Sequence, residues 1–321
     1  MGNLVLAADV GGTNLRMAAV DADGNVLHRD RASTPHDSDP TRVIGAIAEL
    51  ANKCRGALKD TGDITAIGVA FPATLDAAKG LIHFAPNLPM LNGIRLSADL
   101  EKLLGLNVIL ENDATSAAIG EHWLGASRGA RQSICVTLGT GVGGGLIIND
   151  EPYRGPDGTA GEIGHICVEP DGHSCGCGSW GCLEQYSSAT AVVRMAKELA
   201  AETIDSAVDG KSSLTAADIY GLAAHGDAVA VETYRKMGCY LGVGLAGLIN
   251  MLNPETIVIA GGMAAAWDLF IEHTRNQIAK RAFREPAARA KLVRAELGDD
   301  AGILGVARVA FSTAKQGILE G

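Results

Sequence analysis

Two stretches of this chain repeat one pattern, in which an apolar strand runs into a glycine turn and a second strand returns from it. Residues 4–20 have Gly11-Gly12 at the turn, and residues 133–149 have Gly139-Thr140-Gly141. Short apolar runs that end at glycine favour strands, and a unit that occurs twice indicates two related halves. The sequence therefore predicts an α/β chain whose two domains are variations on one strand meander.

The remaining patterns add helices around these strands. Apolar residues at helical spacing predict helices over residues 190–201, 216–224, 227–252 and from 301 to about 315, and a strand over 256–260. Residues 237–254 carry no charge, but they include four glycines and two asparagines, so a tightly packed core helix is favoured over a membrane span. The expected domains are residues 1–112 plus 301–321 and residues 113–300.

Composition excludes several classes of protein. The chain has 321 residues, is 47% hydrophobic and carries a net charge of −10, which argues against a surface that binds nucleic acid. A phosphate ligand must then be held by backbone amides, metal ions or a few basic side chains. Seven cysteines in a chain of this length do not form a disulfide framework, and no signal peptide or membrane segment is expected. A soluble protein of the reducing cytoplasm fits best.

A glycine-rich loop at residues 161–184 concentrates side chains that bind metals. One imidazole and three thiols are the soft donors that zinc takes in a closed tetrahedral structural site. Cysteines this close together in one loop are poor core patterning, which disfavours the alternative that they are merely buried small residues. The predicted ligands are His165, Cys175, Cys177 and Cys182.

The histidine ligand is not settled by spacing alone. His173 lies in the same run and is the alternative to His165, and Cys167 is a further thiol nearby. A bound metal would order the loop and fix Glu162 and Glu184 at its two ends. Those two carboxylates are therefore candidates for binding a substrate.

The first glycine turn is not a Rossmann fingerprint, because residues 15–20 after it read as a strand and not as a helix. No GxxxxGK[ST] motif is present either. A hairpin tip of glycine can still bring backbone N–H groups and the Thr13 hydroxyl to phosphate oxygens. Asp9 before it is placed to hold Mg²⁺ through water. With Gly139-Thr140-Gly141 and Gly261-Gly262, three glycine-ended strands are expected to surround one nucleotide.

Asn112 and Asp113 stand where a strand gives way to a helix. One interpretation is a helix cap. A second, compatible with the first, is that Asp113 accepts the proton of a substrate hydroxyl that attacks a γ-phosphoryl group, a reaction in which catalysis is mostly positioning and charge neutralisation.

Five motifs together resemble the ROK family of bacterial sugar kinases, and its glucokinases in particular. The resemblance covers nearly the whole chain, and the cysteine motif with the upstream GEIGH is its most specific part. One residue departs from the family pattern: Ala73 follows Pro72 where these kinases commonly have glycine, in a loop that could lie near the sugar. The motifs are DVGGTN (9–14), END (111–113), LGTGVGGG (138–145), GTAGEIGH (158–165) and CGCGSWGCLE (175–184).

The resemblance implies an actin-like, ribonuclease-H-like fold of two domains with the active site in the cleft between them, an Mg-ATP-dependent hexose kinase and a structural zinc. It makes Asp113 the general base. It makes the sugar contacts Asn87, Asn112, Asp113, Glu162, His165 and Glu184, and the zinc ligands His165, Cys175, Cys177 and Cys182. The residues that it places along the ATP phosphates are Asp9, Gly11, Gly12, Thr13, Asn14, Gly139, Thr140 and Gly141. Those that it places near the adenosine are Gly261 and Gly262.

Several alternatives stay open at this level. The hexose is expected to be glucose, but N-acetylglucosamine, N-acetylmannosamine, fructose or allose fit the same chemistry. A sugar-sensing regulator of the same family carries an added N-terminal helix-turn-helix, for which a first strand at about residue 4 leaves no room. A catalytically silent, zinc-stabilised protein is disfavoured because Asp9, Thr13 and Asp113 are all present. The resemblance also implies a homodimer or homotetramer, and the phosphoryl donor is open.

Overall fold

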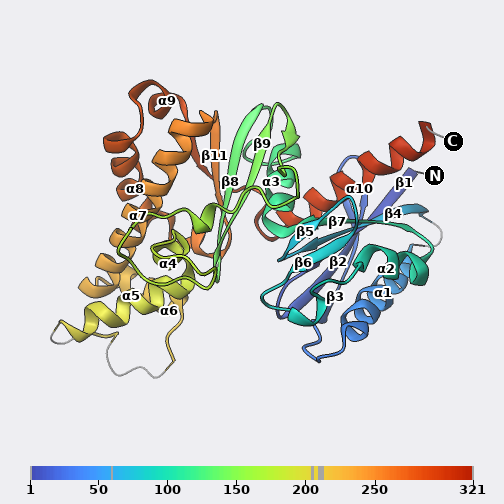
Figure 1. Ribbon diagram of the computed structural model, residues 1–321, viewed down its shortest axis with the longest axis horizontal. Helices are drawn as coiled ribbons and strands as arrows, with labels where there is room; N and C mark the ends of the chain where they lie inside the picture. Colours follow the sequence, from blue (N-terminus) through green and yellow to red (C-terminus); the bar gives the residue numbers. More distant parts are fainter. Residues whose placement is uncertain (1, 59–60, 204–205, 209–212, 320–321) are drawn as a thin grey trace. The chain divides into compact units, whose positions relative to one another are not determined.

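Contacts within the chain divide it into two units, each described here by itself. The computed structural model describes residues 2–58, 61–203, 206–208 and 213–319 (Figure 1). The first unit holds residues 1–129, 145–161 and 296–321, and the second holds 130–144 and 162–295.

The first unit is built on a five-stranded sheet. Its strands lie in the order β3 (Val26–Ser33), β2 (Asn14–Asp21), β1 (Gly2–Val10), β4 (Gly62–Phe71) and β7 (Asn107–Asn112). The first three form the predicted antiparallel meander, and β4 and β7 run parallel to β1. The carboxyl ends of β1, β4 and β7 therefore meet at one edge of the sheet.

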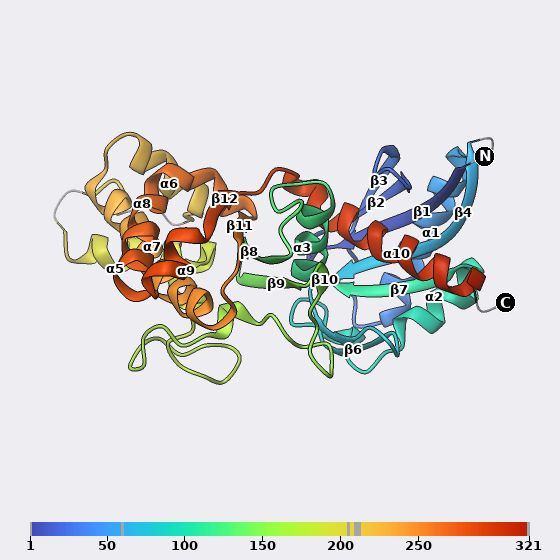
Figure 2. The ribbon, with the colours of Figure 1, turned by 90° about the horizontal axis from the view of Figure 1, so that it is seen from above.

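Both faces of this sheet are covered, because its inner strands carry consecutive apolar side chains that point alternately to the two faces. Leu4 and Leu6 of β1 face a core shared with α1 (Pro40–Ala57) and α2 (Leu96–Leu104). Val5 and Ala7 face the other core, which is completed by α10 (Ala301–Leu319). Figure 2 shows α10 lying along the strands of this unit. Its shorter elements are β5 (Thr74–Asp76), β6 (Leu81–Phe84), η1 (Pro89–Leu91), α3 (Asp113–Trp123) and η4 (Gly298–Asp300).

The second sheet has the same strand order as the first, if the strands of each sheet are numbered separately along the chain. Its strands lie in the order β10 (Glu151–Pro152), β9 (Val142–Ile148), β8 (Gln132–Leu138), β11 (Thr256–Ala260) and β12 (Lys291–Arg294), and the division between the units falls within β9. The predicted repeat and α/β class are thus confirmed. The helices of the second unit are η2 (Ile163–His165), α4 (Glu184–Ser187), α5 (Ala189–Ala201), α6 (Ala216–Ala224), α7 (Ala228–Leu252), η3 (Gly262–Ala266), α8 (Trp267–Arg281) and α9 (Arg284–Arg289).

The uncharged stretch at 237–254 lies mostly within α7, as predicted. Its small residues allow close packing: a Cβ at Gly238 would lie 2.4 Å from the backbone oxygen of Phe270 on α8, and one at Gly242 would lie 2.5 Å from that of Thr274. Across the described residues, no helix has both the length and the apolar character needed to cross a membrane.

The compact units divide at other places than the predicted domain boundaries at 112/113 and 300/301. Helix α3, expected in the second domain, belongs to the first unit because it packs against α10. The segment 145–161 also belongs there, and residues 1, 59, 60, 320 and 321 of the predicted first domain lie outside the described residues.

Helices α3 and α10 touch backbone to backbone. A Cβ added at Gly305 of α10 would lie 1.7 Å from the Ser116 carbonyl oxygen, and one at Gly120 of α3 would lie 2.2 Å from that of Ala301. No side chain fits at such distances, so the two helices can approach this closely only with glycine at both positions.

We expect Gly305→Ala to lower the free energy of unfolding by at least about 2 kcal/mol, because the methyl group forces the two helices apart. Urea denaturation measures it. The matched control is Gly45→Ala on the exposed face of α1, where a Cβ meets nothing within 4 Å. That change should stabilise by up to about 1 kcal/mol through helix propensity. Equal effects of the two substitutions would contradict the packing argument.

Candidate functional site

The β1–β2 turn of the first unit is held by backbone and hydroxyl contacts. Gly11 N–H donates to the Asn14 carbonyl at 2.9 Å, and the Thr34 hydroxyl donates to the Gly11 carbonyl at 2.8 Å. A Cβ at Gly12 would lie 3.5 Å from Cβ of Asn87. The structure therefore brings Asn87, predicted to contact sugar, against the turn predicted to contact phosphate.

Asp9 at the end of β1 has a partner that the sequence analysis missed. Its carboxylate forms an ion pair with Arg16, which lies directly opposite in the hairpin register, and Arg16 Nη1 lies 3.6 Å from Asp299 Oδ2. Counting residues outward from the glycine turn would have found this pair. Gly302 in the first turn of α10 is also near, since its Cβ would lie 3.8 Å from the Asp9 carboxylate.

The predicted cap at the strand-to-helix boundary is present. Asn112 is the N-cap of α3, and its side-chain oxygen accepts the Thr115 N–H at 2.9 Å. Its amide group donates to the carbonyl of Ala73 at 3.3 Å, which ties the loop that departs from the family pattern to this cap. Asp113 is the first helical residue, where the helix dipole stabilises a negative charge, and it accepts the Ala114 N–H at 2.8 Å.

The other two glycine turns lie together in the second unit, because β8 and β11 are adjacent and parallel. The Gly139 carbonyl accepts the Ala189 N–H at the start of α5 at 2.8 Å, and the Thr140 carbonyl accepts the Thr190 hydroxyl at 2.8 Å. Gly261 adopts a left-handed φ of 84°, and a Cβ there would lie 2.4 Å from the Leu138 carbonyl oxygen.

Glu184 lies against the β8–β9 turn. Its Oε2 accepts the Val142 N–H at 3.1 Å, and a Cβ at Gly141 would lie 2.2 Å from the same oxygen. Glycine at 141 thus makes room for this carboxylate. A residue predicted to bind sugar and a turn predicted to bind phosphate are adjacent here, as they are at Gly12 and Asn87.

The four predicted metal ligands converge. Their donor atoms all lie within 4.8 Å of one another. Sγ of Cys177 is 3.7 Å from Sγ of Cys182, and Sγ of Cys175 is 3.6 Å from Nδ1 of His165. A tetrahedron with zinc–sulfur bonds of about 2.3 Å and a zinc–nitrogen bond of about 2.0 Å has edges of roughly 3.8 and 3.5 Å. The donor types and the spacing therefore fit zinc.

The thiols of the cluster differ in their pKa values. Burial, and then the neighbouring thiols of Cys177 and Cys175, raise the pKa of Cys182 to about 12. A hydrogen bond from the Ser179 backbone is the main cause that lowers the pKa of Cys177. Three thiolates at this spacing repel one another, and a cation among them offsets that repulsion.

His165 connects the cluster to the carboxylates. Its Nδ1 faces the cysteines, while its Nε2 lies 3.8 Å from Oε2 of Glu162. Partial loss of water raises the pKa of Glu162; the nearby His165 opposes that rise, and Glu184 adds to it. One ring nitrogen is thus directed to the metal-binding cluster and the other to an acidic group.

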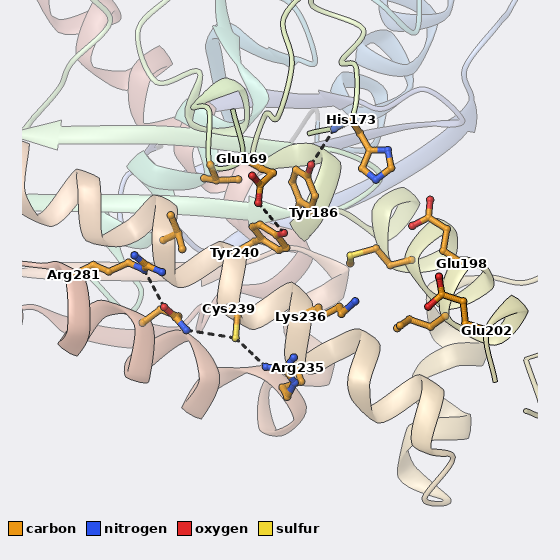
Figure 3. Close-up of a pocket in the computed structure, with 15 residues that line it drawn as sticks. Glu169, His173, Tyr186, Glu198, Glu202, Arg235, Lys236, Cys239, Tyr240 and Arg281 are labelled. Carbon is orange, nitrogen blue, oxygen red and sulfur yellow. Dashed lines mark hydrogen bonds between the residues drawn. The ribbon is translucent and has the colours of Figure 1, made fainter. Parts of the chain in front are cut away.

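His173, the alternative ligand, lies elsewhere. Its Nε2 contacts Arg194, and its backbone N–H donates to the Tyr186 hydroxyl at 3.0 Å. Figure 3 shows it on the wall of a cavity of about 600 Å³, whose other walls come mostly from α5, α7 and α8. Cys167 is exposed and does not belong to the cluster either.

Comparison with known proteins identifies the family. The model of the ROK family matches residues 5–312. A glucokinase of Streptomyces coelicolor is 36% identical over 316 residues, which cover 96% of this chain and 97% of that protein. The transcriptional regulator NagC of Escherichia coli K12 is 31% identical over 304 residues, which cover 94% of this chain and 72% of the regulator.

A solved structure gives the same result. The ROK family glucokinase of Streptomyces griseus, in complex with glucose and AMPPNP, superposes with a TM-score of 0.83 at 35% identity and covers 96% of this chain and 99% of that one. The chain belongs to the ROK family, and its fold is the actin-like fold of the ROK sugar kinases.

We expect Gly261→Ala to lower the free energy of unfolding by at least about 2 kcal/mol, since it combines left-handed strain with a clash against the Leu138 backbone. The control is its neighbour Gly262→Ala, where a Cβ meets nothing within 4 Å and the effect should be within about 0.5 kcal/mol. Urea denaturation compares them. Two similar values would show that the Gly261 turn can adjust.

Proposed function

We propose that this protein is a glucokinase, which transfers the γ-phosphoryl group of ATP to the 6-hydroxyl of glucose. The observation that supports this most is Asp113 at the start of α3, capped by Asn112, in the same unit as the β1–β2 glycine turn that contacts Asn87. The similarity to glucokinases over almost the full length of both chains supports the choice of glucose.

In this proposal Asp113 accepts the proton of the sugar hydroxyl as that oxygen attacks phosphorus. The N-terminus of α3 stabilises the carboxylate before the transfer, and the Asn112 cap holds the backbone in place. Backbone N–H groups of the turns at Gly11-Gly12 and Gly139–Gly141, with the Thr13 and Thr140 hydroxyls, would bind phosphate oxygens. Asp9 would hold Mg²⁺, which neutralises phosphate charge when it is bound.

The side chains proposed to hold the sugar hydroxyls are Asn87, Asn112, Asp113, Glu162, His165 and Glu184. Carboxylate, amide and imidazole groups suit hydroxyls because they donate and accept hydrogen bonds in fixed planes. Zinc on His165, Cys175, Cys177 and Cys182 would fix the ring of His165 and leave its Nε2 for the sugar.

Further features belong to the same proposal. Gly261-Gly262 would lie near the adenosine. The protein would work in the cytoplasm, in glycolysis, as a homodimer or homotetramer. N-acetylhexosamines, fructose and allose are the competing substrates, and a coupled assay of ADP release across a panel of hexoses with Mg-ATP decides among them.

Asp113→Asn should lower kcat for glucose by at least about 10²-fold and leave KM for ATP little changed, because the amide cannot accept the proton. Steady-state kinetics measure both. The matched control is Asp39→Asn, an exposed N-cap of α1 where asparagine caps equally well and kcat should not change. Near-wild-type turnover of Asp113→Asn would remove Asp113 from the proposed mechanism.

Elemental analysis should find about one zinc per chain. Cys177→Ser should lose the metal together with most of the glucose affinity measured by calorimetry, since a disordered loop no longer positions Glu162 and Glu184. ATP binding should persist. Cys167→Ser is the matched control, because Cys167 is outside the cluster, and it should retain both zinc and sugar.

The two histidines give a second comparison. His165→Ala should lose the zinc, and His173→Ala should keep it. The proposal is wrong if metal-free protein binds glucose as tightly as the metal-loaded form, or if the two histidine variants behave in the reverse way.

A further inference from the structure

A buried charge precedes the proposed base. Glu111, the next-to-last residue of β7, is 2% exposed. Its Oε1 accepts the backbone N–H of Asn112 at 2.9 Å, and its Oε2 accepts Nε of Arg154 at 2.7 Å. Nη2 of Arg154 reaches the same Oε2 at 2.5 Å. A buried carboxylate needs such a partner, because its charge has lost the solvation of water.

Arg154 is itself held in place. It follows β10, which packs beside α3 in the first unit (Figure 2). Its carbonyl accepts the Ala160 N–H at 3.0 Å, and its Nη1 donates to the Pro152 carbonyl at 3.4 Å. The backbone of Arg154 and its guanidinium are therefore each held by a hydrogen bond that does not involve Glu111.

We propose that the Arg154–Glu111 ion pair positions Asp113, a role that rests on Asp113 being the base. Asn112 is held at three points: its N–H by Glu111, its side-chain oxygen by the Thr115 N–H, and its amide group by the Ala73 carbonyl. Only the first depends on a group that an ion pair keeps in place. Without Arg154, the buried carboxylate of Glu111 has lost its cation, so it turns toward water and releases the Asn112 N–H.

The geometry requires arginine in particular. Nε and Nη2 both donate to Oε2, so Oε1 stays available for the Asn112 N–H. A lysine at 154 would supply the charge without the planar pair of donors, and its ammonium would not orient the carboxylate in the same way. Charge and orientation can therefore be separated by substitution.

The test uses Arg154→Lys and Arg154→Met in the full-length protein. Arg154→Lys should stay folded and lower kcat for glucose about tenfold, with KM for ATP unchanged, because the base is held less firmly. Arg154→Met should lower kcat further, to about 10²-fold below wild type. Hydrogen exchange of the peptide that contains Asn112 should be faster in both variants. Wild-type kcat and exchange in folded Arg154→Lys would overturn the proposal.

A rescue distinguishes positioning from a general loss of stability. Glu111→Gln keeps an oxygen for the Asn112 N–H and has no charge to neutralise, so Glu111→Gln/Arg154→Met should recover at least about tenfold in kcat over Arg154→Met alone. No recovery would overturn the proposal, and if Arg154→Met does not fold, a folded double variant with kcat within tenfold of wild type supports it.

Arg235→Met is the matched control. It breaks an ion pair with Glu232, with contacts of 2.6 and 2.7 Å, in the second unit, and should leave kcat unchanged. A kcat loss in this control as large as that of Arg154→Met would also overturn the proposal. If instead Asp113 is not the base, the result is different: Asp113→Asn then keeps its turnover, with or without the Arg154 substitutions.

Discussion

The backbone contact between α3 and α10 is the constraint on which the first unit depends. Gly305 and Gly120 let the two helices meet with no side chain between them. Helix α3 begins at Asp113, and the first turn of α10 reaches Asp9 through Gly302. One close packing therefore sets the places of both a proposed base and a proposed magnesium ligand. The same contact explains why α3 belongs to the first unit and not to the second.

A different principle organises the second unit. Two parallel strands, β8 and β11, end at one edge of their sheet, and glycine at 261 lets the backbone after β11 approach that of Leu138 more closely than any side chain would allow. Glu184 occupies the space left by Gly141, and the loop that carries it is folded on a His–Cys₃ cluster. The metal ligands and the carboxylates are thus parts of one loop. The loop has few apolar residues to order it, and bound zinc would stabilise its folded conformation.

Local patterns were sufficient for much of this structure. The meanders, α6, α7 and β11 were predicted nearly to the residue, because apolar periodicity and glycine are local signals. The cluster could be predicted since its four ligands fall within eighteen residues of one another. Helix α8 and strand β12 were missed: residues 267–281 are rich in charged and polar side chains, and β12 has four residues at the end of a sheet.

The sequence by itself determined the two strand meanders, the three cysteines of the cluster and the place of Asp113 at the start of a helix. Each depends on residues that are close along the chain. Only the tertiary structure placed His165, and not His173, beside the three cysteines, and brought Arg154 to Glu111 across 43 residues. Those partners are set by strand register and by helix packing. A periodic pattern of apolar residues does not record which charged side chains such packing brings together.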